Sequence, residues 1–238
     1  MVLAAGRGLR LRPITESRPK PLVEMAGRSL LDRVLDRLAA SGVADCVINT
    51  HHLGAMIHEH LTARATPRIR FSDEDALLET GGGVKHALPL LGDGPFYIVN
   101  ADVLWLDGRR PALERLARAW DEGAMDALLL VHPTVRAYGY DGQGDFFLDP
   151  AGRARRRRAG EVAPYVFTGI EIAHPRLFAD APDGAFSINL LFDRAEHAGR
   201  LAAIVHDGEW FHVGTPDSLA GAEAALRDLF PGDPRRDP

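Results

Sequence analysis

The stretch that decides the fold lies at the start of the chain and reads Leu3-Ala4-Ala5-Gly6-Arg7-Gly8-Leu9-Arg10-Leu11-Arg12-Pro13-Ile14-Thr15, closing with Arg18-Pro19-Lys20-Pro21-Leu22. A short apolar strand runs directly into a loop that combines glycines with cations. Glycine lets backbone N–H groups approach a ligand closely, and the cations attract negative charge. The spacing is not that of a P-loop, and Leu11 replaces the third glycine of the dinucleotide fingerprint. The stretch therefore predicts a polyphosphate site of another type.

Composition sets the outer limits of the fold. The chain has 238 residues, of which 46% are hydrophobic and 26% charged, which is typical of one soluble α/β domain. We expect this domain over residues 1–230 and a disordered polar tail over 231–238. A formal net charge of -5 argues against a nucleic-acid binder. A single cysteine, no signal peptide and no membrane-length apolar run favour a cytoplasmic protein without a membrane partner.

Strand-like and helix-like segments alternate along the chain. Apolar strands are expected near 46–49, 69–71, 96–99, 127–131 and 165–172, with helices near 30–41, 111–122, 186–198 and 216–229. Ser29 can cap the first of these helices together with Asp32. The alternation predicts a mostly parallel sheet with helices on both faces.

A second glycine motif occurs at Leu78-Glu79-Thr80-Gly81-Gly82-Gly83. Three glycines at a helix start let the backbone lie against a planar group and read a base edge through main-chain hydrogen bonds. A flexible hinge is the alternative for this motif alone. Further along, Asn100-Ala101-Asp102 follows a strand, where a carboxylate can hold Mg²⁺ next to a triphosphate or can simply cap the turn.

The segment 132–172 differs in texture, with many glycines, aromatics and charges. We expect a β-rich insertion that forms a sugar pocket, in which Asp145 accepts hydrogen bonds and Gly144 allows close approach. The turn 149–152 predicts a hairpin that leads into the arginines between Arg153 and Arg158. A solvated charge run is the favoured interpretation of these arginines, and a sugar-phosphate contact is the alternative.

Four histidines invite a metal interpretation; they are His51, His52, His58 and His60. Their spacing lacks a supporting carboxylate, so a structural zinc site is disfavoured. His51 and His52 are expected at the carboxyl edge of the second strand, and the other two on a helix surface.

From Leu3 to Leu22 the chain resembles the signature L-A-[AG]-G-x-G-x-R-x-x-P-x-T-x-x-x-P-K-P-L of the sugar-1-phosphate nucleotidyltransferases. The resemblance implies a three-layer, Rossmann-like fold and transfer of a nucleotidyl group to a sugar 1-phosphate. It implies catalytic roles for Arg10, Lys20 and Asp102. The nucleotide would be bound by Ala4, Ala5, Gly6, Gly8, Leu9, Arg10, Lys20, Thr80, Gly81 and Gly82, and the sugar phosphate by Asn100, Gly144, Asp145, Thr168 and Gly169.

The chain departs from the family pattern in one place. Relatives usually read Trp-x-Asp-[IV]-Gly-Thr, with the aspartate as a second metal ligand beside Asp102, whereas this chain has His212 there. Because neutral imidazole suits Mn²⁺ better than Mg²⁺, the implied Mg²⁺ cofactor could be replaced by Mn²⁺. Other interpretations are that His212 contacts phosphate or an outer-shell water, or that activity is lost.

Within the family, the chain is most similar to short uridylyltransferases that act on N-acetylmuramic acid α-1-phosphate, which favours UTP and that sugar as substrates. Guanylyltransferases of mannose 1-phosphate or heptose 1-phosphate, and a weakly active nucleotide-binding regulatory module, are the alternatives. The sequence leaves open whether the protein is a monomer or a homodimer.

Overall fold

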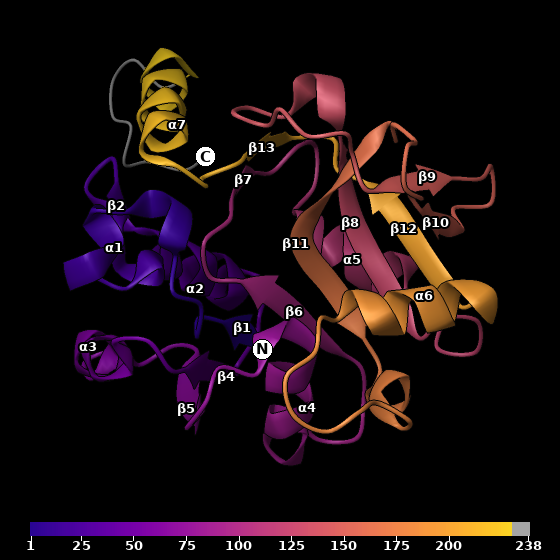
Figure 1. Ribbon diagram of the computed structural model, residues 1–238, viewed down its shortest axis with the longest axis horizontal. Coiled ribbons are helices and arrows are strands. Elements are labelled where there is room, and N and C mark those ends of the chain that lie inside the picture. Colours follow the sequence, from indigo (N-terminus) through magenta and orange to yellow (C-terminus); the bar gives the residue numbers. More distant parts are fainter. Residues whose placement is uncertain (230–238) are drawn as a thin grey trace.

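The computed structural model describes residues 1–229, so the tail expected over 231–238 lies outside the described residues. A mixed, mostly parallel sheet forms the middle layer (Figure 1). Its strands are β1 (Val2–Leu3), β4 (Asp45–Thr50), β5 (Arg68–Asp73), β6 (Phe96–Asn100), β8 (Ala127–Pro133), β9 (Phe146–Leu148), β10 (Ala154–Arg156), β11 (Tyr165–Ala173) and β12 (Leu201–Val205).

The strand β1 lies in the middle of this sheet and pairs in parallel with β4 and β6. Beyond them, β5 pairs in parallel with β4 and β12 with β8, whereas β11 runs antiparallel to both β6 and β8. Val2 is fully buried, because a central strand is covered by helices on both faces. The carboxyl ends of β1, β4 and β6 therefore meet at one edge, where open α/β sheets bind ligands.

Helices cover both faces of the sheet, which confirms the predicted three-layer fold. On one face lie α2 (Leu30–Ala40), α3 (Gly54–Leu61) and α5 (Ala112–Ala119), and on the other α4 (Glu79–Leu91) and α6 (Asn189–His197). The predicted cap of α2 is present, since the Ser29 hydroxyl accepts a hydrogen bond from the Asp32 N–H at 3.0 Å. Such a cap satisfies one of the free donors at a helix start.

A smaller packing unit stands beside the sheet. It contains α7 (Pro216–Leu229) and two short antiparallel pairs, β2 (Glu24–Met25) with β3 (Arg28–Ser29) and β7 (Leu104–Leu106) with β13 (Glu209–Phe211). The short helix α1 (Ile14–Ser17) and the 3-10 turns Leu9–Leu11, Lys20–Leu22, Thr134–Arg136 and Pro175–Phe178 complete the described elements. In this unit β13, which precedes α7, pairs with β7, which follows β6.

Two helices are shorter than predicted. Helix α5 ends at Ala119 instead of continuing to residue 122, and α6 begins at Asn189 instead of residue 186. The carbonyl of Phe186 accepts from the N–H groups of Gly81 and Gly82, and the N–H of Leu190 donates to Ser187 instead, so Phe186 makes no helical hydrogen bond within α6. Along α6, Leu191 and Ala195 are buried, whereas Leu190 is 39% exposed.

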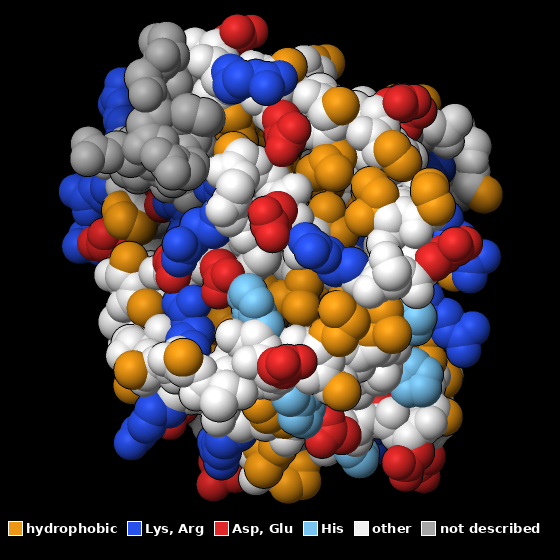
Figure 2. Space-filling model, turned by 90° about the vertical axis from the view of Figure 1, so that its left-hand side faces the viewer, with side chains coloured by type: hydrophobic (Ala, Val, Ile, Leu, Met, Phe, Trp, Pro, Cys, Tyr) orange, Lys and Arg blue, Asp and Glu red, His pale blue; other side chains and the backbone are white. Residues whose placement is uncertain are grey.

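The surface carries mixed charge. On the face shown in Figure 2, Lys and Arg side chains alternate with Asp and Glu side chains instead of forming one basic patch. Among residues 1–229, no helix combines the length and the apolar character that crossing a membrane requires.

Candidate active site

Three adjoining pockets open at the carboxyl edge of the sheet, and Asp102 borders all of them. The first pocket follows the N-terminal motif, the second lies over the ends of β1, β4 and β6, and the third extends toward β11 and β13. We call them the phosphate pocket, the nucleoside pocket and the sugar pocket, after the roles argued below.

Residues of the N-terminal motif line the phosphate pocket, and their binding of phosphate stays a prediction. The residues around this pocket are Leu3, Ala4, Gly6, Gly8, Leu9, Arg10, Lys20, Pro21, Asp102 and Gly214. Two hydrogen bonds fix the backbone of this loop. The Thr15 hydroxyl donates to the Gly8 carbonyl at 2.8 Å, and the Ala4 N–H donates to Asn49 Oδ1 at 2.8 Å. Ala5, the other predicted nucleotide contact in the motif, lines the nucleoside pocket.

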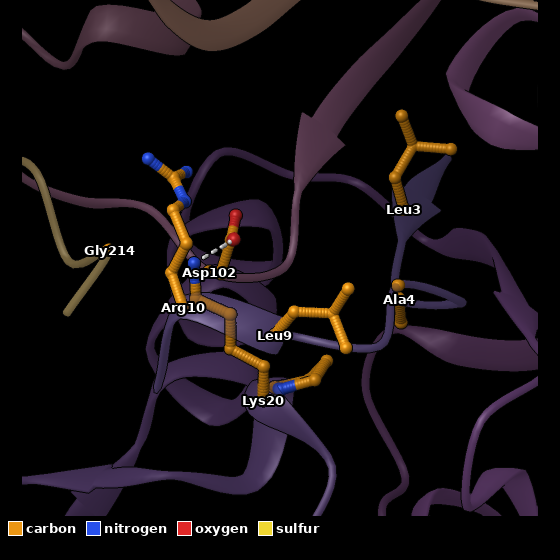
Figure 3. A pocket seen from close by; sticks show the side chains of 10 residues that line it. Leu3, Ala4, Leu9, Arg10, Lys20, Asp102 and Gly214 are labelled. Atoms are coloured by element: carbon orange, nitrogen blue, oxygen red, sulfur yellow. Dashed lines mark hydrogen bonds and ion pairs between the residues drawn. The ribbon is translucent and has the colours of Figure 1, made fainter. Parts of the chain in front are cut away.

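Lys20 and Asp102 form an ion pair at the junction of the pockets. The Lys20 Nζ lies 2.5 Å from Asp102 Oδ2, and Arg10 lies beside the pair (Figure 3). The Lys20 side chain is 13% exposed and that of Asp102 is 32% exposed. The three residues predicted to be catalytic are thus brought together from two segments 82 residues apart.

The nucleoside pocket is lined by Leu3, Ala5, Gly6, Asn49, Leu77, Glu79, Thr80, Asn100, Asp102 and Ser187. Of the predicted base-binding residues, Thr80 is among them, but Gly81 and Gly82 are not. Both glycine N–H groups donate to the carbonyl of Phe186, at 2.9 and 3.2 Å. A Cβ on Gly81 would lie 2.3 Å from the Phe186 ring, so this glycine is required by packing. The nucleotide-binding role of the two glycines stays a prediction.

A buried polar network behind this pocket was not predicted from the sequence. Asn49 donates through Nδ2 to Glu74 Oε1 at 2.7 Å, and Glu74 Oε2 accepts from the Leu78 N–H at 2.9 Å. Since Asn49 also accepts from Ala4, the network ties the end of β1 to the start of α4. A signal for Asn49 was available in its position, because it is the next-to-last residue of β4 and Asn100 is the last residue of β6.

The sugar pocket is lined by Arg10, Lys20, Asn100, Asp102, Val103, Tyr140, Asp145, Val166, Phe167, Thr168, Gly169, Trp210, Phe211, His212 and Val213. Asp145 Oδ2 accepts from the Phe167 N–H at 2.8 Å. Burial raises the pKa of the Asp145 carboxyl above its ordinary value, and that hydrogen bond and the charge of Arg157 oppose the rise. The carboxyl is therefore held in place, and its other oxygen has no hydrogen-bond partner among residues 1–229.

Three other residues predicted to contact the sugar phosphate, Gly144, Thr168 and Gly169, make contacts within the fold. A Cβ on Gly144 would lie 2.1 Å from the Ala163 carbonyl oxygen, so protein backbone makes the close approach that the sequence suggested for a sugar. The Thr168 hydroxyl donates to the Leu130 carbonyl at 2.7 Å and points into the core. Gly169 leaves room for the side chain of Asn100, which lines both the sugar and nucleoside pockets.

The interpretation of the arginines as a solvated charge run is wrong for three of them. Arg155 pairs with Glu161 at 2.8 Å and Arg156 with Asp193 at 2.5 Å. Arg157 donates to the Gly144 carbonyl at 2.9 Å and so fixes the loop of the sugar pocket. These arginines have partners within the fold because the hairpin places Arg156 next to α6 and Arg157 next to the loop of the sugar pocket.

His212 lies among aromatic rings in the sugar pocket, 5.9 Å from the Trp210 ring and 6.0 Å from the Tyr140 ring, centre to centre. Burial, and next the positive charges of Arg10 and Lys20, lower the pKa of His212 below its ordinary value. The imidazole is therefore neutral at neutral pH and keeps a lone pair for a metal or a hydrogen bond.

The residues present fit a metal only in part. Asp102 supplies a carboxylate and His212 a neutral imidazole, but within residues 1–229 no group of three or more His, Cys, Asp or Glu side chains could hold an ion. Phosphate oxygens of a substrate would have to complete the ligand set. His51 and His52 contact the carbonyls of Glu74 and Thr15, and His58 and His60 contact carboxylates on the surface.

The fold and the pockets define a nucleotidyltransferase. The family model described as nucleotidyl transferase matches residues 1–145, and the chain belongs to this family of enzymes, as the N-terminal motif predicted. Such enzymes are generally dependent on a divalent metal.

Curated relatives are similar over almost the whole chain. The chain is 45% identical over 233 residues to the N-acetylmuramate alpha-1-phosphate uridylyltransferase of Caulobacter vibrioides, covering 96% of each chain. It is 36% identical over 228 residues to the protein of the same name from Neisseria meningitidis serogroup B, covering 94% of this chain and 96% of that one.

A solved structure supports the fold. The crystal structure of a putative glucose-1-phosphate thymidylyltransferase from Bacillus anthracis superposes with a TM-score of 0.78 at 20% identity and covers 95% of this chain and 94% of that chain.

Proposed function

We propose that the protein transfers a uridylyl group from UTP to N-acetylmuramic acid α-1-phosphate and releases pyrophosphate. The observation that carries the proposal is the position of Asp102 and Lys20, which lie together where the phosphate and sugar pockets meet. The choice of UTP and of this sugar is supported by the names of the Caulobacter and Neisseria relatives.

The reaction needs no strong general base. An oxygen of the sugar phosphate bonds to the α-phosphorus of UTP while the bond to the bridging α–β oxygen breaks, and the electron pair leaves with pyrophosphate. A phosphate monoester is already ionised at neutral pH and is itself the nucleophile. Catalysis is therefore positioning and charge neutralisation, which suits a site built from cations and backbone donors.

The cations divide this work by position. Arg10 and Lys20 both border the phosphate and sugar pockets. Arg10 would hold the β- and γ-phosphates, and Lys20 would bridge the α-phosphate and the sugar phosphate. For this, Lys20 must share or release its hydrogen bond to Asp102. A divalent cation held by Asp102, and by His212 as second protein ligand, would neutralise charge on the reacting phosphates.

The test is a matrix of pyrophosphate release, with five triphosphates (UTP, GTP, CTP, ATP and dTTP) against N-acetylmuramic acid α-1-phosphate, mannose 1-phosphate and glucose 1-phosphate. Each pair is run with Mg²⁺ and with Mn²⁺. We expect the highest kcat/KM for UTP with N-acetylmuramic acid α-1-phosphate. Turnover of GTP with mannose 1-phosphate instead would make the protein a guanylyltransferase. Binding of triphosphates without turnover of any pair would favour the regulatory module.

A further inference from the structure

Glu79 has a backbone conformation that side-chain-bearing residues rarely adopt. Its φ is +59°, in the left-handed region, although it is the first residue of α4. Such a conformation is unfavourable for any residue except glycine, by about 1–2 kcal/mol. Residues held in this way concentrate at functional sites, so an outlier of this kind is a reason to ask what its side chain does.

The strain is maintained by contacts on both sides of Glu79. The Leu78 N–H is bonded to Glu74, and the Leu78 carbonyl accepts from Phe186 at 3.2 Å. After Glu79, the Thr80 hydroxyl accepts from the Ile188 N–H at 3.0 Å. The neighbours fix the backbone, and the conformation of Glu79 follows from them.

The carboxylate of Glu79 is left unused by the protein. Glu79 lines the nucleoside pocket and is exposed, and among residues 1–229 its side chain has neither a hydrogen-bond partner nor an ion-pair partner. A residue in this position that served only the fold would be better replaced by glycine. The carboxylate is therefore available to a ligand.

Charge is divided unequally between the pockets. The charged residues that line the nucleoside pocket are Glu79 and Asp102, whereas Arg10, Lys20 and Asp102 line the phosphate pocket. Asp102 is paired with Lys20, so among residues 1–229 Glu79 supplies the unpaired charge of the nucleoside pocket. An unpaired carboxylate repels phosphate and accepts hydrogen bonds from groups that donate them. A uridine has such donors in its ribose hydroxyls and in the imide N–H of the base, and carboxylates are strong acceptors for both.

We propose, building on the proposed function, that Glu79 is a specificity-determining residue whose carboxylate accepts a hydrogen bond from the nucleoside of the triphosphate. The donor is a ribose hydroxyl or the base imide N–H, and the two are distinguished by analogues that lack one or the other.

The test compares UTP with 2′-deoxy-UTP, 3′-deoxy-UTP and N3-methyl-UTP in the wild-type protein, Glu79→Gln and Glu79→Gly. A hydrogen bond to a charged group contributes about 1.5–3 kcal/mol, so the wild type should disfavour at least one analogue by roughly tenfold or more in kcat/KM. Both variants should lower kcat/KM for UTP and reduce this discrimination to less than about threefold. The analogue whose disadvantage disappears identifies the donor.

A matched control is Ala26→Gly, since Ala26 has a similar φ of +50° in the turn between β2 and β3 and borders none of the three pockets. Neither glycine variant should lower the unfolding temperature, but only Glu79→Gly should change discrimination. Unchanged discrimination in Glu79→Gln and Glu79→Gly, with an active wild type, would overturn the inference and leave the proposed function standing. An inactive wild type would overturn the proposed function, and calorimetric binding of UTP and its analogues would then decide the role of Glu79.

Discussion

Replacing Lys20 with methionine should remove most of the catalytic rate and leave the fold nearly unchanged. The Lys20 Nζ is 2.5 Å from Asp102 Oδ2, and the Lys20 side chain borders the two pockets between which the uridylyl group would be transferred. Loss of one preorganised charge stabiliser lowers the rate by roughly 10²–10³, or about 2.7–4 kcal/mol of transition-state stabilisation. We expect kcat/KM to fall by this amount.

The effect on stability should be much smaller. The Asp102 side chain is 32% exposed, so its carboxylate stays hydrated after Lys20 is removed. Ion pairs with this degree of exposure contribute about 1 kcal/mol or less to the free energy of unfolding. The variant should therefore lose several times more transition-state stabilisation than folding stability.

The assay measures pyrophosphate release and the unfolding midpoint of the same preparations. Lys20→Arg keeps the charge and should retain more activity than Lys20→Met. Arg68→Met is a matched control, because Arg68 pairs with Asp45 at 2.9 Å at the opposite, amino-terminal edge of the strands. Activity of Lys20→Met within threefold of wild type would refute the reasoning, as would an equal loss in Arg68→Met.

Three further predictions concern other residues. His212→Asp should shift the preferred ion from Mn²⁺ toward Mg²⁺, because a carboxylate suits Mg²⁺ better than imidazole does; an unchanged activity ratio in the two metals would exclude His212 as a ligand. Glu171 is buried in the middle of β11, and burial raises its pKa well above the ordinary value. Its contribution to stability is full below the ordinary carboxyl pKa and is lost as pH rises toward the raised one, so Glu171→Gln should flatten the decline of the unfolding temperature from pH 5 to pH 8, and parallel curves would contradict this. Gly144→Ala places a Cβ 2.1 Å from a carbonyl oxygen at a φ of +71° and should destabilise the fold by about 2 kcal/mol or more. It should also raise the KM for the sugar phosphate more than the KM for UTP; unchanged thermal unfolding would contradict this prediction.

Local signals in the sequence predicted the local parts of the fold. Ser29 and Asp32 predicted the start of α2, and the turn at Asp149–Gly152 predicted the β9–β10 hairpin. Both features depend on residues only a few positions apart. Such features are determined by short-range chemistry. The sequence also assigned Lys20 and Asp102 to one site, but it did not predict the direct ion pair between these two residues, which lie 82 positions apart.

Contacts between distant segments could not be predicted in this way. The N–H and carbonyl of Phe186 bind the start of α4, which shortens α6, and nothing near residue 186 indicates that partner. Arg156 forms an ion pair with Asp193, 37 residues further along the chain. Because that partner is distant in sequence, the run of arginines was interpreted as solvated. Asn49 lines the site because the fold places it there, outside both motifs. Glu79 belongs to the second glycine motif, but its left-handed backbone conformation could not be predicted from that motif.

The position of Asp102 connects the observed ion pair with the metal dependence of the family. In the absence of substrate, Lys20 neutralises Asp102. In the proposed reaction, a triphosphate would draw Lys20 to its own oxygens and would bring negative charge close to the carboxylate of Asp102, which is unfavourable at short range. A divalent cation held by Asp102 would offset this repulsion. Nucleotide and cation should therefore bind cooperatively, because the carboxylate that Lys20 neutralises before binding would be neutralised by the metal afterwards.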